Sequence, residues 1–525
     1  MLQRIELVLL PEEAAHEQEF KNKIAKHLRI SENEIRDFRL AKRSIDARSK
    51  QVKFRLFFDV AIQEDLLPVE KEVRALQDVR TKTPVLIIGA GPAGLFAAIQ
   101  LIELGYKPIL IERGKDVRQR RRDLALISKQ GEVNPNSNYC FGEGGAGTYS
   151  DGKLYTRSDK RGNVKRALAT FVQFGATNDI TVDAHPHIGT NKLPGIVTAM
   201  REAIEACGGE VHFNTLLTSI KITDQQVLGI MVTPSEGGME YSIDGKSIIL
   251  ATGHSARDVF KLLHRQNILI EAKDFALGVR IEHPQELIDQ VQYHCDSRSE
   301  HLPPASYSFS GQFEGKGVYS FCMCPGGIIA PASTAPGEVV VNGWSPSKRN
   351  NPFANSGMVV SVEQEDMKAF ASHGPLAAME FQSAVERACF DAGGGRLVAP
   401  AQRMVDFCEG KFSRTINSTS YLPGVSSCDL KDVLPTSILK PLQKGLMEFG
   451  KKMKGYYSNE AMLVATESRT SSPVRIPRDK ESCMHPQIKG LFPCAEGAGY
   501  AGGIISAAMD GERCAEASVR YLESI

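Results

Sequence analysis

Three stretches of the chain match the pattern G-x-G-x-x-G, in which closely spaced glycines allow a backbone to approach phosphate groups. In the first stretch, Gly89 permits a tight turn, Gly91 leaves room for a pyrophosphate, and Gly94 lets a helix pack closely on a strand. Glu112 follows eighteen positions after Gly94 and could accept hydrogen bonds from the ribose hydroxyls of an adenosine. A carboxylate at this position disfavours a 2′-phosphate. The residues therefore predict FAD or NAD as the ligand rather than NADP.

The elements around this stretch are those that a dinucleotide site requires. The apolar run 84–88 is typical of a buried parallel strand, 95–104 of a helix that ends at Gly105, and 107–111 of a second strand. The start of the helix would offer free N–H groups and a partial positive charge to the phosphates. The predicted cofactor contacts of this unit also include Pro92, Ala93 and Arg113. The alternative is a chance cluster of glycines in an ordinary α/β turn, which would not bring all of these parts into register.

The second glycine match, residues 142–147, occurs in different surroundings. It follows a run rich in asparagine rather than a strand, and no apolar helix follows it. We therefore expect a glycine-rich loop and not a second nucleotide fold. Gly145 and Gly147 are predicted to contact the cofactor, and Asp151 and Lys153 to position the cofactor or the backbone.

The third match, residues 497–502, belongs to a longer motif. It follows a strand-like segment and opens a helix, but the chain ends too soon after it for a second strand with a ribose carboxylate. The segment 491–511, LFPCAEGAGYAGGIISAAMDG, resembles the C-terminal motif of the glutathione-reductase-like flavoproteins with two dinucleotide-binding domains. The strand-like run 246–253 ends in the Ala-Thr-Gly that the same proteins place under the cofactor. The resemblance implies that Glu496 contacts the FAD ribitol or pyrophosphate, and that the other FAD contacts include Thr252, Gly253, Gly502, Gly503 and Ile504.

A closer resemblance rests on four strings: GGAGTYSDGKL, GVRIEHPQ, ESRTSSPVRIP and EGAGYAGGI. They are similar to those of the large bacterial family called FAD-dependent or NAD(FAD)-utilizing dehydrogenases, and the similarity covers most of residues 80–525. It implies FAD as the cofactor and an oxidoreductase activity. The family's motifs are specific for FAD and say little about the substrate.

The order of the motifs predicts an α/β protein with a Rossmann-like FAD-binding domain built from separated segments. We expect its first part at residues 79–275 and its C-terminal return at 464–525. The intervening residues 276–463 are expected to form an inserted α+β cap, so that substrate binds between the two domains. Residues 1–78 are expected to form a small α+β module. Its predicted elements are a strand at 5–10, a helix at 11–28, and strands near 34–42 and 53–62.

The N-terminal module contains a basic stretch. Residues 21–55 include twelve Lys or Arg and four Asp or Glu. Such a surface could bind an acidic partner or RNA. We favour a solvated surface balanced by acidic residues of the same module, because no aromatic stacking motif accompanies the charge.

Residues that could carry chemistry lie in two further clusters. Arg469 and Arg475 precede Glu496 by about twenty residues and could bind a carboxylate or phosphate, or stabilise negative charge on the reduced flavin. The alternative is an arginine network that bridges cap and FAD domain. His283 could carry a proton near neutral pH, although a histidine beside proline is more often structural. The sequence does not rank three further proton donors, Tyr307, Tyr319 and Tyr500.

The eleven cysteines are odd in number and scattered, as expected of reduced thiols in a reducing compartment. Neither C-x-x-C nor C-x-x-x-x-C occurs, which excludes the redox pairs of the flavin-linked disulfide reductases. The only close pair is Cys322 and Cys324, whose side chains would share one face of a strand. We expect these two residues to pack as small apolar side chains in a segment that lines the substrate pocket.

The composition is that expected of a soluble cytoplasmic protein. The 525 residues are 42% hydrophobic and carry a net charge of +1, which gives no reason to expect nucleic acid or membrane as the main partner. The start of the chain lacks the features of a signal peptide, and the apolar run 84–102 reads as strand, loop and helix rather than as a membrane span. No metal site is predicted.

These observations predict a FAD-dependent oxidoreductase that transfers a hydride between FAD and a small substrate, with a carboxylate the favoured class. NAD(P)H, if used, would visit the cap cleft transiently. Two alternatives remain at this stage. One is a flavin-dependent reductase of unsaturated bonds, as in the geranylgeranyl reductase relatives. The other is a flavin-binding regulatory or RNA-associated protein in which FAD is structural or a redox sensor.

Overall fold

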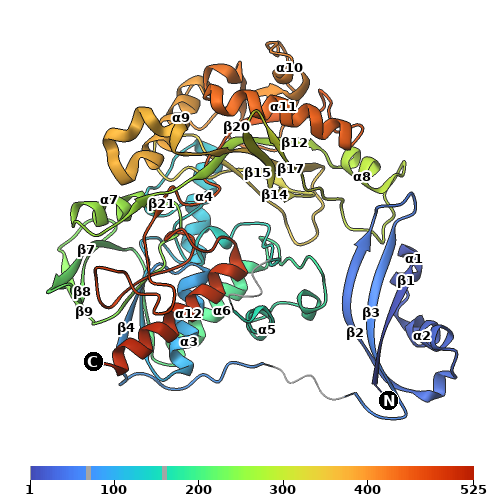
Figure 1. Ribbon diagram of the computed structural model, residues 1–525, viewed down its shortest axis with the longest axis horizontal. Helices are drawn as coiled ribbons and strands as arrows, with labels where there is room; N and C mark the ends of the chain where they lie inside the picture. The colour runs from blue at the N-terminus through green and yellow to red at the C-terminus, as the bar shows by residue number, and fades with distance from the viewer. Residues whose placement is uncertain (1, 67–71, 157–161) are drawn as a thin grey trace.

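The computed structural model describes residues 2–66, 72–156 and 162–525. Residues 2–66 form a module beside the rest of the chain (Figure 1). Three antiparallel strands lie in the order β1-β3-β2, and two short helices cover them. The predicted single helix is divided, because a 3-10 turn at Glu17–Glu19 separates its two halves. The bounds are β1 Leu2–Leu9, α1 Pro11–Ala15, α2 Phe20–Leu28, β2 Ile35–Asp46 and β3 Lys53–Ile62.

Much of the basic charge of this module is paired at short range. Asp59 accepts from Arg4 at 2.7 Å, and Glu6 accepts from Arg55 at 2.5 Å. Arg43 reaches out of the module to Asp183, 2.7 Å away. Backbone bonds join Arg43 to Val182 and Ala184 as well, and Val52, between β2 and β3, is buried in the core of the cap. An RNA or acidic partner for the module stays a prediction.

The main body contains a five-stranded parallel sheet in the order β22-β10-β4-β5-β6. Segments far apart in the chain therefore lie side by side, as expected of a domain built from separated pieces. The bounds are β4 Pro84–Ile88, β5 Lys107–Ile111, β6 Glu210–His212, β10 Ile248–Leu250 and β22 Leu491–Pro493. The α/β fold class with a Rossmann-like domain is confirmed.

The alternation of side chains along β4 explains the layers on either side of this sheet. Val85 and Ile87 pack into a core formed with the helices, whereas Leu86 and Ile88 pack into a core formed with a second sheet. The helices are α3 Pro92–Glu103, α5 Val164–Gln173, α6 Leu193–Ala206 and α12 Ile504–Glu523. The second sheet is antiparallel and consists of β7 Thr215–Thr223, β8 Gln226–Pro234 and β9 Tyr241–Asp244.

The cap is built on a seven-stranded sheet in the order β13-β14-β17-β12-β20-β18-β19, which lies above the parallel sheet in Figure 1. Its strands are β12 Phe275–Pro284, β13 Ser310–Phe313, β14 Lys316–Cys324, β17 Phe353–Val362, β18 Ala399–Arg403, β19 Val425–Ser427 and β20 Met462–Glu467. The helices of the cap are α8 Gln285–Tyr293, α9 Ala377–Gly393, α10 Met404–Cys408 and α11 Thr436–Lys452. Strand β20 pairs with β12 in this sheet, so the chain leaves the cap after Glu467 and not at the expected boundary of 464.

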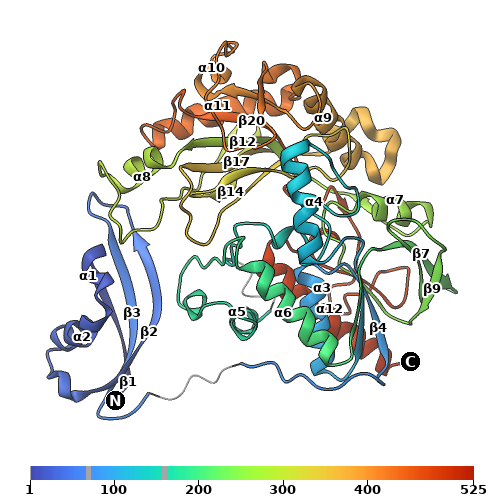
Figure 2. The same cartoon turned by 180° about the vertical axis from the view of Figure 1, so that it is seen from behind.

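Smaller elements connect the two parts. Helix α4, Val117–Gln130, runs from the parallel-sheet domain toward the cap (Figure 2). Helix α7, Arg257–Arg265, follows β10, and the remaining strands form two pairs: β11 Glu271–Ala272 with β21 Val474–Arg475, and β15 Ile328–Pro331 with β16 Val341–Trp344. Among the described residues, no helix combines the length and apolarity needed to span a membrane.

Candidate functional site

One deep cleft lies at the carboxyl ends of the parallel strands, beneath the cap. It holds about 1560 Å³ of space that protein atoms do not fill, part of it open to solvent. The neighbours of β4 are β5 on one side and β10 on the other, so the cleft is at the point where the strand order reverses, the usual place for a ligand in such sheets. Of the predicted cofactor residues, those that line it are Gly89, Gly91, Pro92, Ala93, Glu112, Arg113, Gly145, Gly147, Thr252, Gly253, Glu496, Gly503 and Ile504.

Each glycine of the first glycine loop is small for a different reason. A Cβ on Gly94 would lie 1.9 Å from the carbonyl oxygen of Gly89, so this glycine permits close packing within the protein rather than a ligand contact. Gly89 has φ +105°, and a Cβ there would lie 2.5 Å from the carbonyl oxygen of Ala251. Gly91 is different, because a Cβ on it would meet only the Cα of Gly145, 3.9 Å away. The protein itself leaves Gly91 open, and its smallness matches a phosphate in front of the α3 N-terminus.

Glu112 binds the loops around it as well as facing the cleft. Its carboxylate accepts from the backbone N–H groups of Ala90, Gly114 and Gly142 at 2.9, 2.9 and 3.0 Å. Two of these bonds go to Oε1 and one to Oε2. Oε2 therefore keeps an acceptor position for a ribose hydroxyl.

The second glycine stretch forms a loop with a 3-10 turn at Gly145–Gly147, as expected. It lies against the start of α3, where a Cβ on Gly145 would come within 3.2 Å of the Cα of Gly91. Arg120, fully buried on α4, holds this loop: its guanidinium donates to the carbonyl oxygens of Asn138, Tyr139, Gly142 and Glu143. No local pattern indicates this role, because an arginine in the basic stretch of α4 resembles a surface residue.

The far end of the cleft contains the Ala-Thr-Gly turn and the start of α12. The hydroxyl of Thr252 is buried and has no hydrogen-bond partner among the described residues, which is costly unless a ligand supplies one. Gly503, with φ +84°, is the N-cap of α12, so the N–H groups of Ile504 and its successors face the same space. Gly502 is not part of the lining, and a Cβ on it would lie 3.1 Å from Oε1 of Glu496.

Two ionisable groups meet beside this turn. His254, which the sequence analysis did not single out although it follows Ala-Thr-Gly directly, lies with Nε2 4.0 Å from Oε2 of Glu496. Burial, with Arg469 and Arg257 nearby, lowers the pKa of His254 to about 4. Burial raises the pKa of Glu496 to about 7, with Lys273 acting against it. At neutral pH the imidazole is therefore neutral and the carboxyl group is close to its midpoint.

Arg469 belongs to a network of buried ion pairs. Arg469 is 4% exposed and donates to Glu338 at 2.5 Å, to Glu386 at 3.1 Å and to the hydroxyl of Thr334 at 2.5 Å. Arg257 of α7 pairs with the same two carboxylates at 3.1 and 2.8 Å. Two guanidinium groups and two carboxylates thus neutralise one another across the boundary of cap and FAD domain. Arg469 lines the cleft, but its donors are already engaged.

The other two predicted catalytic residues lie outside the cleft. Arg475 is exposed on β21, with its guanidinium 5.1 Å from the ring centre of Tyr500. His283 is fully buried in the cap and shares a 2.9 Å hydrogen bond through Nε2 with the carbonyl oxygen of Tyr456. Burial lowers the pKa of His283 to about 4, so it is a neutral core residue. Neither Arg475 nor His283 is part of the cleft lining, so a catalytic role for either residue stays a prediction. The tyrosines Tyr307, Tyr319 and Tyr500 are also not part of the lining.

A charged cluster on the cap side of the cleft surrounds the two close cysteines. Lys153 lies with Nζ 3.9 Å from Sγ of Cys322, 3.8 Å from Sγ of Cys324 and 2.7 Å from Asp151. Arg280 of β12 lies 3.4 Å from Sγ of Cys324 and donates to the carbonyl oxygen of Cys322 at 2.6 Å. Cys322 and Lys153 line the cleft, as expected for the segment, and both sulfurs lie beside cationic side chains.

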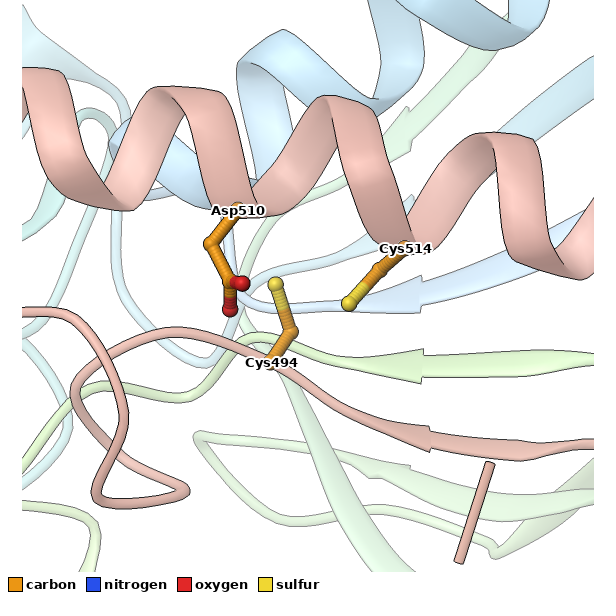
Figure 3. Close-up of side chains that lie close together, drawn as sticks. All are labelled: Cys494, Asp510 and Cys514. Carbon is orange, nitrogen blue, oxygen red and sulfur yellow. The ribbon is translucent and has the colours of Figure 1, made fainter. Parts of the chain in front are cut away.

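A second group of thiols lies behind the parallel sheet. Figure 3 shows Cys494, after β22, pointing toward Asp510 and Cys514 of α12. The carboxylate of Asp510 already accepts from Arg478 at 2.6 and 2.9 Å and from the N–H of Ala495 at 2.7 Å. A metal ion would have to displace the guanidinium that neutralises this carboxylate. The contacts describe a buried ion pair with two thiol neighbours.

Comparison with known proteins places the chain among FAD-dependent proteins. The family model described as "FAD-dependent protein, C-terminal domain-like" matches residues 274–470, a "FAD binding domain" model matches 82–133, and a domain of unknown function matches 1–61. A Clostridium beijerinckii protein whose function is not described is 40% identical over 515 residues, which cover 94% of this chain and 95% of that protein.

Solved structures of flavoproteins are similar at low identity. The structure of CtdE in complex with FAD is 11% identical, with 84% of each chain covered and a TM-score of 0.31. A flavocytochrome c3 fumarate reductase is 14% identical, with 85% of this chain and 79% of that chain covered and a TM-score of 0.33.

FAD is the cofactor of this chain. The FAD-binding family model covers β4, the glycine loop and β5, and the open space at Gly91 and the partnerless hydroxyl of Thr252 fit a bound dinucleotide. The resemblance to a FAD-dependent family is thus supported. Membership of the superfamily with two dinucleotide-binding domains stays a prediction.

Proposed function

The chain belongs to the same family as its Clostridium beijerinckii relative, and from this membership and the FAD-binding models that match the chain we propose that it is an oxidoreductase that transfers a hydride between FAD and a small substrate bound under the cap. The observation that carries the proposal is the single cleft in which FAD-binding residues and cap residues face each other. FAD supplies the two-electron chemistry when bound. The protein binds the dinucleotide and shapes the space above it.

The residues of the chain have distinct tasks in this proposal. Gly91 and the α3 N-terminus hold the pyrophosphate, and Glu112 holds the adenosine ribose. The α12 N-terminus, beginning at Ile504, offers N–H groups to the part of the ligand beside Glu496. Because the pKa of Glu496 is about 7, this carboxyl group could take up or release a proton at its oxygen during turnover.

The two arginines do not support the carboxylate preference that was expected from the sequence. Arg469 has its donors engaged by carboxylates, and Arg475 is outside the cleft. An electron donor or acceptor such as NAD(P)H would enter the same cleft, because the described residues form one parallel sheet of the dinucleotide-binding type.

The test of the cofactor site is Gly91→Val. The branched side chain would occupy the space in front of α3, where a Cβ meets only the Cα of Gly145, 3.9 Å away. We expect a folded protein that binds no FAD, measured by visible absorbance and by chromatography of the released cofactor. Gly195→Val is the matched control, since Gly195 is exposed in the first turn of α6 with nothing near its Cβ. This variant should bind FAD as wild type does, and the cofactor that it releases should be FAD rather than FMN. Normal FAD content in folded Gly91→Val would contradict the assignment.

The test of the reaction is anaerobic bleaching of the wild-type flavin. A panel of small metabolites, with NADH and NADPH, is mixed with the yellow protein and the flavin absorbance is followed. A substrate should bleach the flavin rapidly, and the bleached form should recover with an oxidised acceptor. A flavin that no reductant in the panel bleaches, although dithionite does, would favour a structural cofactor.

A further inference from the structure

Cys322 and Cys324 occupy a part of the cleft whose charges are unbalanced. Three cations lie around the two sulfurs and their immediate partners. Lys153 is near both sulfurs and Arg280 is near that of Cys324. The third cation, Arg349, donates to Asp151. Two carboxylates oppose them: Asp151 binds Lys153 and Arg349, each at 2.7 Å, and Glu467 binds Arg280 at 3.0 Å. With both carboxylates ionised, one positive charge remains.

The backbone turns Cys322 toward this excess charge. The register of β14 against β17 shifts between Phe321 and Cys324, and Cys322 has φ +46°, a conformation that non-glycine residues rarely adopt. As a result Cys322 lines the cleft, whereas Cys324 is completely buried behind it. Non-glycine residues in such strained conformations cluster at functional sites.

We propose that Cys322 is a cleft-facing thiolate and that Cys322 and Cys324 form a dithiol–disulfide couple that exchanges two electrons with FAD. The inference rests on the proposed function, because FAD is the oxidant. In the oxidising direction a bond forms between the two sulfurs, and the S–H bond of Cys324 breaks. The proton and two electrons pass to the flavin, so that Cys322–S⁻, Cys324–SH and FAD become Cys322–S–S–Cys324 and FADH⁻.

The groups that face the pair support a thiolate at Cys322 rather than at Cys324. A hydrogen bond from Cys324, aided by Lys153 and Arg280 and opposed by burial, holds the pKa of Cys322 well below its usual value. Burial raises the pKa of Cys324 well above its usual value.

Other titratable groups around the pair do not supply the missing negative charge. Tyr139 is buried, and burial raises its pKa well above the usual value, so it stays neutral. Glu496, across the cleft, has Lys273 as its own neighbouring cation.

The first experiment counts electrons. Air-oxidised holoenzyme, treated with ferricyanide to close the disulfide and then desalted, is titrated anaerobically with dithionite. We expect four electron equivalents per FAD in wild type and two in Cys322→Ser and in Cys324→Ser. Cys207→Ser, at a partly exposed thiol outside the cleft, is the matched control and should keep four. The proposal would be overturned if wild type took up two electron equivalents per FAD and if the reduced and oxidised proteins contained the same number of free thiols.

The second experiment measures the thiolate directly and does not depend on turnover. Alkylation of Cys322 by iodoacetamide is followed by peptide mass spectrometry as a function of pH. The apparent pKa should lie below the roughly 8.5 of a free cysteine, and Lys153→Met should raise it by about one unit or more. An unshifted pKa in wild type would contradict the thiolate.

The two experiments separate the two proposals. If a substrate reduces the flavin but wild type takes up only two electron equivalents per FAD, the oxidoreductase stands and the cysteine couple fails. If the protein binds no FAD, the proposed function fails with it. The folded state of each variant is checked by its FAD content and thermal midpoint, and Cys322→Ala replaces Cys322→Ser if the serine variant does not fold.

Discussion

At the scale of single residues, similar side chains have opposite roles, and their surroundings decide which. Gly94 is small because a carbonyl oxygen lies where its Cβ would be, whereas Gly91 is small although nothing in the protein requires it. Lys153 and Arg469 both line the cleft. The donors of Arg469 are engaged by carboxylates, but Lys153 lies within reach of two sulfurs. The chemistry of the cleft therefore depends more on Lys153 than on the arginines.

Arg469 provides a test of the network that joins cap and FAD domain. Arg469→Met leaves Glu338 and Glu386 buried with one guanidinium in place of two. Breaking a buried charge network in this way costs about 3–5 kcal/mol. We expect a clearly lower thermal midpoint and weaker FAD retention. Arg475→Met, at an exposed position, should change stability by less than about 0.5 kcal/mol. A thermal midpoint of Arg469→Met equal to that of the control would mean that the network contributes nothing.

We expect the stability of the fold to decrease in acid because His283 is buried in its neutral form. Burial lowers its pKa to about 4 in the folded protein, from the usual 6.5 of a histidine. Between these values the unfolded chain binds a proton that the folded chain does not, so stability is complete above pH 6.5 and is lost as the pH falls toward 4. The loss is about 2 kcal/mol by about pH 5. His283→Gln keeps a donor for Tyr456 but cannot titrate. Its thermal midpoint should fall less than that of wild type between neutral pH and about pH 5, and an equal fall in both proteins would contradict the assignment.

At the scale of elements, the site is assembled from loops that follow parallel strands, and buried side chains hold these loops in place. Glu112 ties the first glycine loop to the second, and Arg120 ties the second to α4. Both are charged residues with backbone partners. Such residues cannot be replaced by an apolar side chain without leaving several backbone groups unsatisfied.

Arg120→Lys tests this support. A lysine ammonium cannot reach the four carbonyl oxygens that the planar guanidinium binds. Each lost charge-assisted bond costs about 1.5–3 kcal/mol. Because Arg120 is absent from the cleft lining, we expect FAD to bind about ten-fold or more weakly through displacement of the loop alone. Equilibrium dialysis of FAD against the apoprotein measures this effect. Arg121→Lys, its neighbour on the exposed side of α4, should bind FAD as wild type does.

Local patterns explain which parts of the fold and site were predictable from the sequence. The stretch from Gly89 to Gly94 and the strands beside it form a unit of consecutive residues, so spacing alone located it. Glu496 was found in the same way, through its motif. The cap could not be predicted in detail, because its first strand, β12, pairs with β17 from the middle and with β20 from the end of the inserted segment. The approach of Lys153 to Cys322 joins residues 169 positions apart, and no local pattern reports such a contact.

At the scale of the whole molecule, the N-terminal module and the flavin cleft are separate. The lining of the cleft begins at Ile88, so no residue of β1, β2 or β3 contributes to it. The module has its own core, which includes Ile24 and Phe58. Residues close before β4 are nevertheless held to the main body by Arg74. Arg74 is buried there and binds Thr170, Gln100 and Glu103, each at 2.8 Å, and also Glu512 of α12.

Two shortened chains that differ by four residues test this division. A chain that begins at residue 72 loses the module but keeps Arg74, and we expect it to bind FAD and to unfold close to the wild-type temperature. A chain that begins at residue 76 lacks Arg74 and leaves Glu512 and Glu103 without this partner, although Glu103 keeps Arg166 at 2.6 Å. An uncompensated buried carboxylate costs about 3–5 kcal/mol. Since α12 begins at the cleft and packs on α3, the longer deletion should lower both the thermal midpoint and the FAD content. Loss of FAD already from the chain that begins at residue 72 would show that the module supports the cleft, through contacts such as that of Arg43 with Asp183.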